Sequence, residues 1–441
     1  MKRLTTRAAW VVALVALPAA PLVILVRSSG GDVFALDIPV VFGILAVVAL
    51  ATTIIVSSRV RALTKGLGIE QILRVHRYAG LAVLGLVLAH VAAVVLRNPA
   101  KGLAYLDLVH ASPTMRSGTI AALAFVLLAV TSVMRRRLRL PYGFWRVVHV
   151  ALAATALAGS AIHIVLLDNL VHSDRMGVWF AAVTASLVAV LVVRWAVRPL
   201  RSGFRVQRVR RESGDVSTLV LAPTGDGPLS RRRPLTFAPG QFAWLRLRRW
   251  GLFSDHPFTI ASAMRADGTV EFTVRHVGDY THKLGRLSPA ARVYLDGPHG
   301  AFSVDNTHAT GLVLLAGGVG ITPMISMLRA LADRGDRRPH RLLVSGRAPE
   351  DLLFIDELRE LQERLHLTVV PTLTRPHPAW RGPTGRIDAQ MLTAVLPGPF
   401  RRNQLDYFLC GSPPFVDGMV STLDEIGIPR QRMHTEQFEL A

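Results

Sequence analysis

The sequence predicts a bundle of six membrane-spanning helices followed by an antiparallel β-barrel and then a parallel α/β domain. Apolar residues are concentrated in the first two hundred positions, alternating segments broken by Gly and Pro follow from Phe204, and a strand, a Gly-rich turn and a helix succeed one another after Gly311. A chain of 441 residues with 51% hydrophobic residues and a mean hydropathy of +0.36 is too apolar for a soluble enzyme and too polar for a protein lying wholly in the membrane. We therefore expect domains at 1–202, 203–308 and 309–441.

The membrane helices are predicted from apolar runs that approach the roughly 20 residues needed to cross about 30 Å of hydrocarbon. Six such runs lie at 8–26, 38–57, 78–96, 119–134, 147–167 and 178–197. The first run follows Lys2, Arg3 and Arg7, as in a signal peptide. We retain it as a span because it stays apolar beyond Ala19 and Ala20, and because its removal leaves an odd number of spans.

The loops between these runs differ in charge and set the expected orientation. Seventeen Lys and Arg side chains lie on the side that holds both termini, against five on the other side. Because positively charged loops stay in the cytoplasm, we predict a multi-pass cell-membrane protein with cytoplasmic N- and C-termini.

Composition also excludes several classes of partner and cofactor. The chain has 51 Lys and Arg against 30 Asp and Glu, a formal charge of +21. Much of this excess lies beside the spans, so we interpret it as facing anionic lipid and expect no nucleic-acid partner. The single cysteine, Cys410, excludes an intrachain disulfide, a Cys-ligated iron–sulfur cluster and covalent c-type haem.

Two of the predicted spans carry pairs of histidines at one spacing. His76 and His90 are 14 residues apart in and beside the third run, and so are His149 and His163 in the fifth. Fourteen residues complete nearly four helical turns and rise about 21 Å, so each pair shares a helix face with one member near each leaflet. Both helices begin on the cytoplasmic side, which places His76 level with His149 and His90 level with His163.

These histidines predict cofactor sites within the bilayer. One histidine in a span is compatible with a hydrogen-bonded core residue, whereas four at identical spacing favour function. Opposed imidazoles suit the axial positions of a planar metal macrocycle, while a bare zinc or copper site needs three or four ligands close together. We predict two bis-histidine b-type haems, with iron ligands His76, His90, His149 and His163. Gly80 and Gly85 either leave room for the ring faces or pack helices.

The segments after Phe204 predict two further kinds of sheet. Alternating stretches at 218–221, 242–247, 270–275 and 293–295, separated by Gly and Pro turns, are typical of a small antiparallel barrel. Strand candidates at 312–316, 341–345, 367–370 and 407–409 alternate with helical segments. The first strand is followed by a Gly-rich turn at 317–323 and a helix at 324–332. That alternation predicts a parallel sheet.

The twin histidine spans followed by His256-Pro257-Phe258-Thr259 resemble the ferric reductase and NADPH oxidase superfamily. The region after Phe204 resembles the ferredoxin–NADP reductase fold, and the resemblance covers nearly the whole chain. It implies that the barrel binds FAD and that the α/β domain binds NAD(P)H.

The resemblance places Phe258 against the isoalloxazine and lets Thr259 hydrogen-bond its edge. It places Arg275 at the FAD pyrophosphate, where Thr281 can cap a helix whose N-terminus faces phosphate. His299 stands where the family usually has an aromatic residue, which is a departure on the adenine side. The residues assigned to FAD are His256, Pro257, Phe258, Thr259, Ser262, Arg275, Thr281, Gly297 and Gly300.

For the nucleotide, glycine lets backbone N–H groups approach phosphate at a helix N-terminus. Arg347 follows a predicted strand where the fold meets the adenosine ribose, and Arg386 can assist it, which favours NADPH over NADH. Cys410 begins the nicotinamide-side loop or is simply a buried core residue, and Phe438 matches a C-terminal aromatic that covers the flavin. The residues assigned to NAD(P)H and to this loop are Gly317, Gly318, Gly320, Thr322, Pro323, Arg347, Arg386, Cys410, Gly411 and Phe438.

Together these features predict a flavocytochrome that moves electrons from cytosolic NAD(P)H through FAD and two b-type haems to an external acceptor. A flavin is needed because NAD(P)H gives two electrons and haem iron accepts one. We favour a ferric chelate as acceptor; oxygen reduction to superoxide, or transfer to a quinone or protein, needs the same core. His110 and His172 lie in predicted outer loops and either bind an acceptor or are solvated. The other classes are a membrane-anchored flavin reductase without haem and a proton-relaying transporter.

Overall fold

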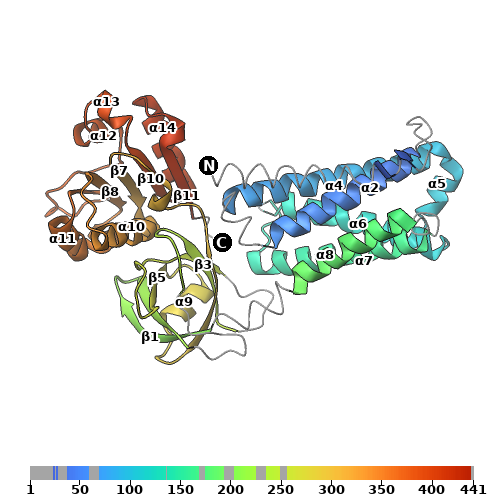
Figure 1. Ribbon diagram of the computed structural model, residues 1–441, viewed down its shortest axis with the longest axis horizontal. Coiled ribbons are helices and arrows are strands. Elements are labelled where there is room, and N and C mark those ends of the chain that lie inside the picture. Colours follow the sequence, from blue (N-terminus) through green and yellow to red (C-terminus); the bar gives the residue numbers. More distant parts are fainter. Residues whose placement is uncertain are drawn as a thin grey trace. The chain divides into compact units, whose positions relative to one another are not determined.

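The computed structural model describes residues 23–24, 26–27, 37–58, 69–135, 137–167, 174–192, 203–224, 235–248 and 256–438. The chain folds as two compact units, Met1–Val197 and Arg198–Ala441. The first is helical, and the second contains an antiparallel and a parallel sheet (Figure 1).

The first unit is built from long apolar helices. They are α2 (Ile38–Ser57), α4 (Ile69–Arg97), α5 (Pro99–Tyr105), α6 (Pro113–Val133), α7 (Tyr142–Leu166) and α8 (Asp174–Val192). In the described ranges, four contain stretches long and apolar enough to cross a membrane: Ile38–Ser57, Ile72–Arg97, Pro113–Val133 and Gly143–Leu166. This chain is therefore a membrane protein, and the second to fifth predicted runs are confirmed as long apolar helices.

The first and last of the six predicted runs are not confirmed as membrane spans. Most of run 8–26 lies outside the described residues. The last run begins as predicted in α8, but the apolar stretch of that helix, Gly177–Ala189, is shorter than a span. The count of six spans therefore stays a prediction.

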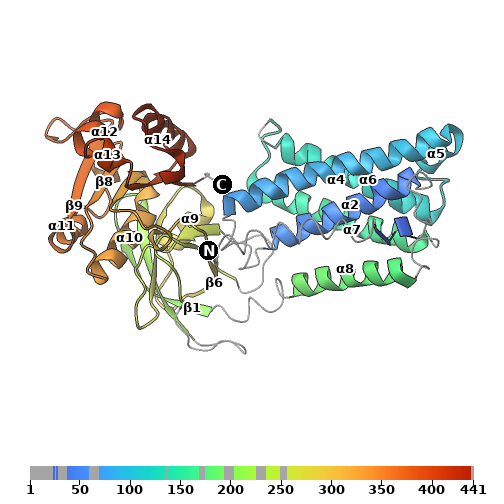
Figure 2. The same ribbon diagram turned by 45° about the horizontal axis from the view of Figure 1, so that its top comes forward.

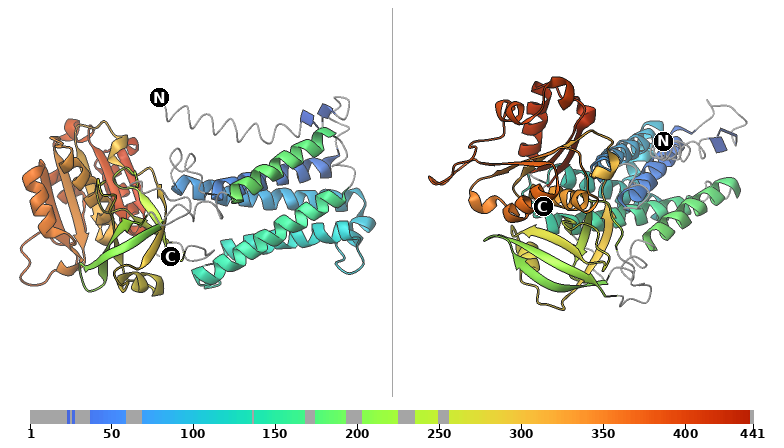
Figure 3. Two further views of the ribbon diagram at one scale, coloured as in Figure 1. Left: turned by 60° about the horizontal axis from the view of Figure 1, so that its bottom comes forward. Right: turned by 60° about the vertical axis from the view of Figure 1, so that its left-hand side comes forward.

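The long helices pack in two pairs, α2 on α4 and α6 on α7, and α4 also contacts α6 (Figure 2; Figure 3). Small residues permit close approach: a Cβ added to Gly159 on α7 would lie 2.9 Å from the carbonyl oxygen of Ser117 on α6. Val83 of α4 meets Phe125 and Ala156 of the other pair in a small buried cluster. Small-residue contacts of this kind are the usual basis of helix packing in lipid, where the hydrophobic effect does not drive association.

The antiparallel sheet of the second unit has the strand order β4-β3-β6-β1-β2-β5. Its strands are β1 (Gly203–Arg211), β2 (Val216–Pro223), β3 (Phe242–Arg246), β4 (His256–Thr259), β5 (Val270–Arg275) and β6 (Arg292–His299). Ile260, directly after β4, forms a bridge with Phe272 of β5, so the sheet curls toward a barrel. The inward residues, among them Leu219, Leu245 and Phe272, form one buried cluster. Helix α9 (Asp279–Gly285) follows β5.

The parallel sheet has the order β11-β10-β7-β8-β9. Its strands are β7 (Leu312–Gly317), β8 (His340–Gly346), β9 (Leu367–Leu373), β10 (Asp406–Gly411) and β11 (Met433–Gln437). Helices α10 (Ile321–Asp333) and α11 (Ile355–Arg364) cover one face. Helices α12 (Ala389–Val395) and α14 (Pro413–Glu425) cover the other, and α13 (Pro399–Arg402) is a single turn. Alternate residues of β7 and β10 face the two layers, as expected of a sheet that is buried on both sides.

The two sheets share a core. Val216, Ala261 and Phe302 of the antiparallel part pack in the same buried cluster as α10 and strand residues such as Leu314. Ser326 of α10 reinforces the contact, because its Oγ donates to the carbonyl oxygen of Ser262 at 2.9 Å.

Candidate functional site

The four membrane histidines form two facing pairs in the first unit. The ring centres of His76 and His149 (the first pair) are 6.3 Å apart, and those of His90 and His163 (the second pair) are also 6.3 Å apart. In each pair one ring comes from α4 and the other from α7. His76 and His149 are the first histidines of their helices, and they face one another. Helices α4 and α7 therefore run in the same direction, as predicted.

Each of the four Nδ1 atoms lies beside an oxygen of the neighbouring helix. His76 and His90 of α4 reach the carbonyl oxygens of Thr53 and Pro39 on α2, at 3.3 and 2.7 Å. His163 of α7 reaches the carbonyl oxygen of Thr114 on α6 at 2.8 Å. A carbonyl oxygen only accepts hydrogen bonds, so in these three rings Nδ1 carries the proton and donates it.

The fourth ring has a hydroxyl partner. Nδ1 of His149 lies 3.1 Å from Oγ of Ser132 on α6. Ser132 already donates its one proton to the carbonyl oxygen of Leu128, at 2.7 Å, so its oxygen accepts from His149. All four rings are therefore held as the tautomer with Nδ1–H, which leaves Nε2 with a free lone pair.

This arrangement fits an iron macrocycle between each pair. The two rings of each pair face one another at 6.3 Å between centres, so the free Nε2 atoms of each pair would hold one iron. A backbone or hydroxyl oxygen on Nδ1–H is the usual second contact of a metal-binding histidine. A Cβ added to Gly80 or Gly85 of α4 would meet no described atom within 4 Å, so neither glycine is needed for close packing against the helices that the structure describes.

Several residues around these rings were missed by the sequence reasoning. No sequence motif marks the hydrogen-bond acceptors of the four Nδ1 atoms. Three of them are backbone oxygens, which every residue has, and the fourth is the hydroxyl of Ser132 on another helix. Trp145 lies one turn before His149, and their ring centres are 5.1 Å apart. The guanidinium carbon of Arg135 lies 5.3 Å from the centre of the Trp145 ring. A Cβ added to Gly118 would lie 2.8 Å from Nδ1 of His163, so this position must stay small.

The remaining predicted residues lie in the second unit. The His256–Thr259 segment is β4, where Phe258 pairs with Ala243 and Pro257 with Trp244. His256 stacks on Tyr280 of α9 at 4.0 Å between ring centres, and Phe258 is nearly parallel to the same ring at 6.4 Å. Tyr280, which sequence reasoning missed, donates its hydroxyl proton to the carbonyl oxygen of Leu245 at 2.7 Å.

Thr259 provides the test of whether this strand fits a flavin. Its side chain is buried, and no partner for its Oγ1 is found in the part of the chain that the structure describes. A buried hydroxyl without a partner is costly, which suits a group that binds a polar ligand edge. By contrast, Oγ of Ser262 accepts from the backbone N–H of Glu271 at 3.2 Å, so that hydroxyl is used within the fold.

The residues assigned to the FAD pyrophosphate lie around the end of β5. Thr281 is the third residue of α9, and its hydroxyl accepts from the N–H groups of Val277 and Gly278 at 2.9 and 3.0 Å. Thr281 is thus the N3 residue of a capping box and accepts from the N–H of the N-cap residue Gly278, so it caps the start of the helix as we expected. Gly297 lies in β6, and Gly300 just beyond it has φ +100, a conformation that favours glycine.

The Gly-rich turn connects β7 to α10. Gly318 adopts φ +56, and a Cβ added to Gly320 would clash with the carbonyl oxygen of Cys410. The turn thus packs directly on β10, and Thr322 and Pro323 are buried in the first turn of α10. Thr322 Oγ1 donates to the carbonyl oxygen of Val319 at 3.0 Å. We expected the helix to begin at 324; it begins three residues earlier.

The C-terminal ends of β10 and β11 complete this edge of the sheet. Cys410 is fully buried, and Gly411 approaches Phe415 so closely that a Cβ would lie 2.7 Å from its ring. Phe438 follows β11: its N–H donates to the carbonyl oxygen of Gly411 at 3.0 Å, and its side chain packs against the core cluster that contains Cys410.

The two arginines assigned to the nucleotide follow neighbouring strands. Arg347 is exposed directly after β8, and Arg386 is exposed after Thr384, which forms a bridge with Leu373 at the end of β9. The carbonyl oxygen of Arg347 also accepts from the N–H of Arg375 at 2.8 Å, which adds a third arginine that we had not predicted. Ligands of parallel α/β sheets bind at this carboxyl-terminal edge.

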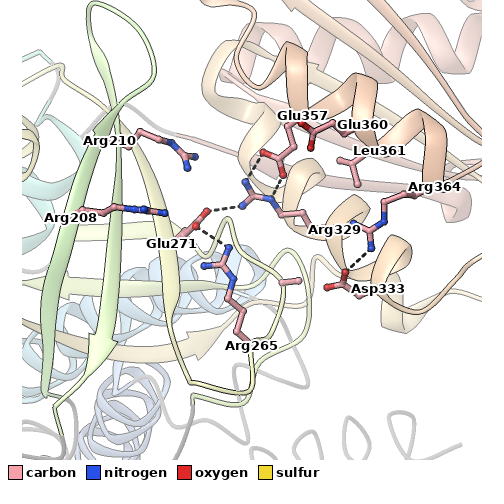
Figure 4. Close-up of a pocket in the computed structure, with 11 residues that line it drawn as sticks. Arg208, Arg210, Arg265, Glu271, Arg329, Asp333, Glu357, Glu360, Leu361 and Arg364 are labelled. Atoms are coloured by element: carbon pink, nitrogen blue, oxygen red, sulfur yellow. Dashed lines mark hydrogen bonds and ion pairs between the residues drawn. The ribbon is translucent and has the colours of Figure 1, made fainter.

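A separate cavity of about 420 Å³ lies between the antiparallel part and helices α10 and α11 (Figure 4). None of the predicted cofactor residues lines it. Arg329 crosses it, donating to Glu271 at 2.9 Å and to Glu357 at 2.5 and 2.7 Å. Burial alone would raise the pKa of Glu271, but Arg329 and Arg265 outweigh it and hold that pKa below its ordinary value. This cluster joins the two sheets and is structural.

Three parts of the chain match known families. Residues 42–160 match the ferric reductase like transmembrane component, 228–303 match an FAD-binding domain, and 314–421 match the oxidoreductase NAD-binding domain. These regions follow one another in the order of the structural units described above.

Relatives of the second unit are reductases. Ferredoxin–NADP reductase B of Sorangium cellulosum is 32% identical over 215 residues, which are 46% of this chain and 86% of that protein. The reductase component of propane 2-monooxygenase from Rhodococcus jostii is 28% identical over 241 residues, 53% of this chain, and the match spans only 62% of its length. Among solved structures, a ferredoxin NADP+ reductase from Neisseria gonorrhoeae with bound FAD and NADP is 22% identical with a TM-score of 0.46, covering 54% of this chain and 98% of that one.

The three matched regions, their order and the 32% identical reductase agree with the resemblance inferred from the motifs. The chain belongs to the ferric reductase and NADPH oxidase superfamily, as a membrane protein whose ferric reductase-like transmembrane component is followed by FAD-binding and NAD-binding domains of the ferredoxin–NADP reductase type.

Proposed function

We propose that this protein carries electrons from cytosolic NADPH through FAD and two b-type haems to a ferric chelate on the opposite side of the membrane. The observation that carries the proposal is the state of the four histidines. Every Nδ1–H is engaged by an oxygen, and the two rings of each pair face one another at 6.3 Å between centres, so each pair would hold one haem iron.

The chain's own residues position the cofactors. FAD, when bound, accepts a hydride and releases electrons singly, and haem accepts them one at a time. Phe258 and the buried Thr259 hydroxyl hold the flavin ring, and Arg275 holds its diphosphate. The turn Gly317–Gly320 offers backbone N–H groups to the nucleotide, and Phe438 covers the flavin. No side chain is required as an acid or base for the transfer.

The proposal includes an orientation. Six spans with both termini in the cytoplasm, and domains at 1–202, 203–308 and 309–441, place the FAD and NADPH sites on the side where NADPH is made. The excess of Lys and Arg on that side supports this orientation. His90 and His163 then hold the haem nearer the acceptor.

The test uses the purified full-length chain. We expect a reduced-minus-oxidised spectrum with about two b-type haems per polypeptide, and Fe(III)-chelate reduction with NADPH in the absence of oxygen. A spectrum without haem, or haem retained after all four histidines are replaced by leucine, contradicts the proposal and leaves a membrane-anchored flavin reductase. Superoxide formation with no anaerobic iron reduction instead identifies oxygen as the acceptor.

Nucleotide choice has its own test. Arg347, directly after β8, and Arg386, two residues after the bridge between Thr384 and the end of β9, suit a 2′-phosphate, which only NADPH carries. In Arg347→Ala we expect kcat/KM to fall for NADPH and to change little for NADH. An unchanged ratio of the two efficiencies contradicts the assignment of Arg347.

A further inference from the structure

The guanidinium of Arg275, at the end of β5, is held by two carboxylates. Its Nη2 donates to Oδ1 of Asp351 at 2.6 Å, and its Nε lies 3.2 Å from Oδ2 of Asp215. Asp215 precedes β2 in the antiparallel part, whereas Asp351 follows β8 in the parallel part. Arg275 therefore joins the two sheets at their proposed cofactor edges.

Asp351 has a second partner on its other oxygen. Oδ2 accepts from the backbone N–H of Arg347 at 3.0 Å. The turn between these residues is tight, since the N–H of Asp351 donates to the carbonyl oxygen of Ala348 at 3.0 Å, and a Cβ added to Gly346 would lie 3.0 Å from Cβ of Asp351. One carboxylate thus accepts hydrogen bonds from both a guanidinium and the start of the Arg347 loop.

The two groups held by Asp351 belong to different proposed sites. Arg275 is assigned to the FAD pyrophosphate and Arg347 to the 2′-phosphate of NADPH. Arg275 also adjoins the Gly-rich turn, because a Cβ added to Gly318 would lie 3.4 Å from its Nη1. The side chains of Arg275 and Asp351 are 25% and 23% exposed, so their interaction is less screened than a surface ion pair.

We infer that Asp351 couples the binding of FAD to the binding of NADP(H). The inference rests on the proposed assignments of Arg275 and Arg347. A dinucleotide bound at either arginine restrains the Asp351 side chain, and through it the other arginine. The second ligand then meets a site that is already ordered, so each ligand tightens the other, and linkage requires the two effects to be equal.

Absolute affinities do not test this idea, because Asp351 is also a negative charge beside two anionic ligands. Replacing it with a neutral residue changes both affinities by electrostatics alone. The ratio of FAD affinities with and without NADP+ removes that contribution. Asp215→Asn is the matched control, since it removes the same charge from the same guanidinium without touching the Arg347 loop.

The experiment titrates FAD into the flavin-depleted full-length protein in detergent, by flavin fluorescence, with and without saturating NADP+. For the unaltered protein and for Asp215→Asn we expect NADP+ to lower the FAD dissociation constant by about fivefold or more. For Asp351→Asn, whose amide offers one acceptor oxygen in place of two, we expect the ratio to fall to about one. If Asp351→Asn does not assemble, Asp351→Ser replaces it.

A ratio near one in the unaltered protein, or an undiminished ratio in Asp351→Asn, overturns the inference. If NADP+ no longer lowers the FAD dissociation constant in Asp215→Asn, the inference is overturned too, since any negative charge beside Arg275 would then produce the coupling. Failure of the proposed function gives a different result: the unaltered protein binds no FAD, or binds FAD without the haem spectrum.

Discussion

The two histidine pairs of the membrane unit have the same ring separation but different surroundings. In the second pair, Nδ1 of His90 and of His163 donates to backbone carbonyl oxygens at 2.7 and 2.8 Å. In the first pair the corresponding distances are 3.3 Å for His76 and 3.1 Å for His149, and the latter acceptor is a hydroxyl. The same side chain therefore makes shorter hydrogen bonds in the second pair than in the first.

This difference has a chemical consequence for the proposed haems. A stronger hydrogen bond from Nδ1–H makes the imidazole a more basic ligand, which favours ferric over ferrous iron and lowers the reduction potential. On this ground alone, a haem in the first pair is easier to reduce and one in the second pair is the stronger donor. We therefore expect the two haems to be distinguishable, and the following substitutions test that expectation.

The largest effect is expected from removing one ligand of each pair in separate variants. His149→Leu and His163→Leu each delete one of the two histidines proposed to hold one haem, so each variant is expected to lose about one of the two proposed haems while the other pair keeps its own. Haem per polypeptide and the potential of the haem that remains are the measurements. Loss of both haems from either variant would show that the pairs are not independent sites.

The next effect concerns the space beside each pair. A Cβ at Gly118 lies 2.8 Å from Nδ1 of His163, closer than real Cβ contacts, whereas a Cβ at Gly43 lies 3.4 Å from Nδ1 of His90, an ordinary contact. Gly118→Ala must rotate the His163 ring away from Thr114, and we expect the affinity for the second haem to fall about 10–100-fold. Gly43→Ala is the control and should retain both haems. Equal haem loss in the two variants contradicts this geometry.

These contrasts also show what the sequence could predict. Apolar runs located α2, α4, α6 and α7, because a membrane span imposes a length and a composition that few other structures share. The equal spacing of the histidines then determined which rings would face one another. The hydrogen-bond acceptors of the histidine Nδ1–H groups could not be predicted, since three of the four are main-chain oxygens and a single sequence does not show which helix packs against which.

The second unit shows the same limit. Strand 270–275 was predicted with the bounds it has, since its apolar residues are uninterrupted by turns. Strand β1 was missed because arginines occupy most of its outward positions, and β4 was missed because it has four residues and contains Pro257. Asp351 had no motif to mark it: its role depends on Arg275, 76 residues away in the chain.

A smaller effect is expected from Ser132→Ala. The substitution leaves Nδ1–H of His149 without its acceptor, weakens the ligand and should raise the potential of the first haem by up to about 60 mV, a tenfold change in the preference for ferric iron. The second haem should not move. Thr131→Ala is the matched control, because that neighbouring hydroxyl bonds to the carbonyl oxygen of Leu127 and not to a histidine. Potentiometric titration of both variants decides the matter, and a lowered or unchanged potential in Ser132→Ala contradicts the tautomer assigned to His149.

The smallest effect concerns the cation beyond the first pair. The guanidinium carbon of Arg135 lies 5.3 Å from the ring centre of Trp145, which in turn lies 5.1 Å from the ring of His149. Reduction adds an electron, so removing this positive charge in Arg135→Gln should lower the potential of the first haem, opposite in sign to Ser132→Ala. The shift is expected to be on the order of 10 mV at low salt and to shrink as ionic strength rises, because the charge is remote from the iron and partly screened. Arg135→Lys keeps the charge and should keep the potential. If the glutamine and lysine variants shift equally, or the shift persists at high salt, the guanidinium acts on the Trp145 ring by packing and not by its charge.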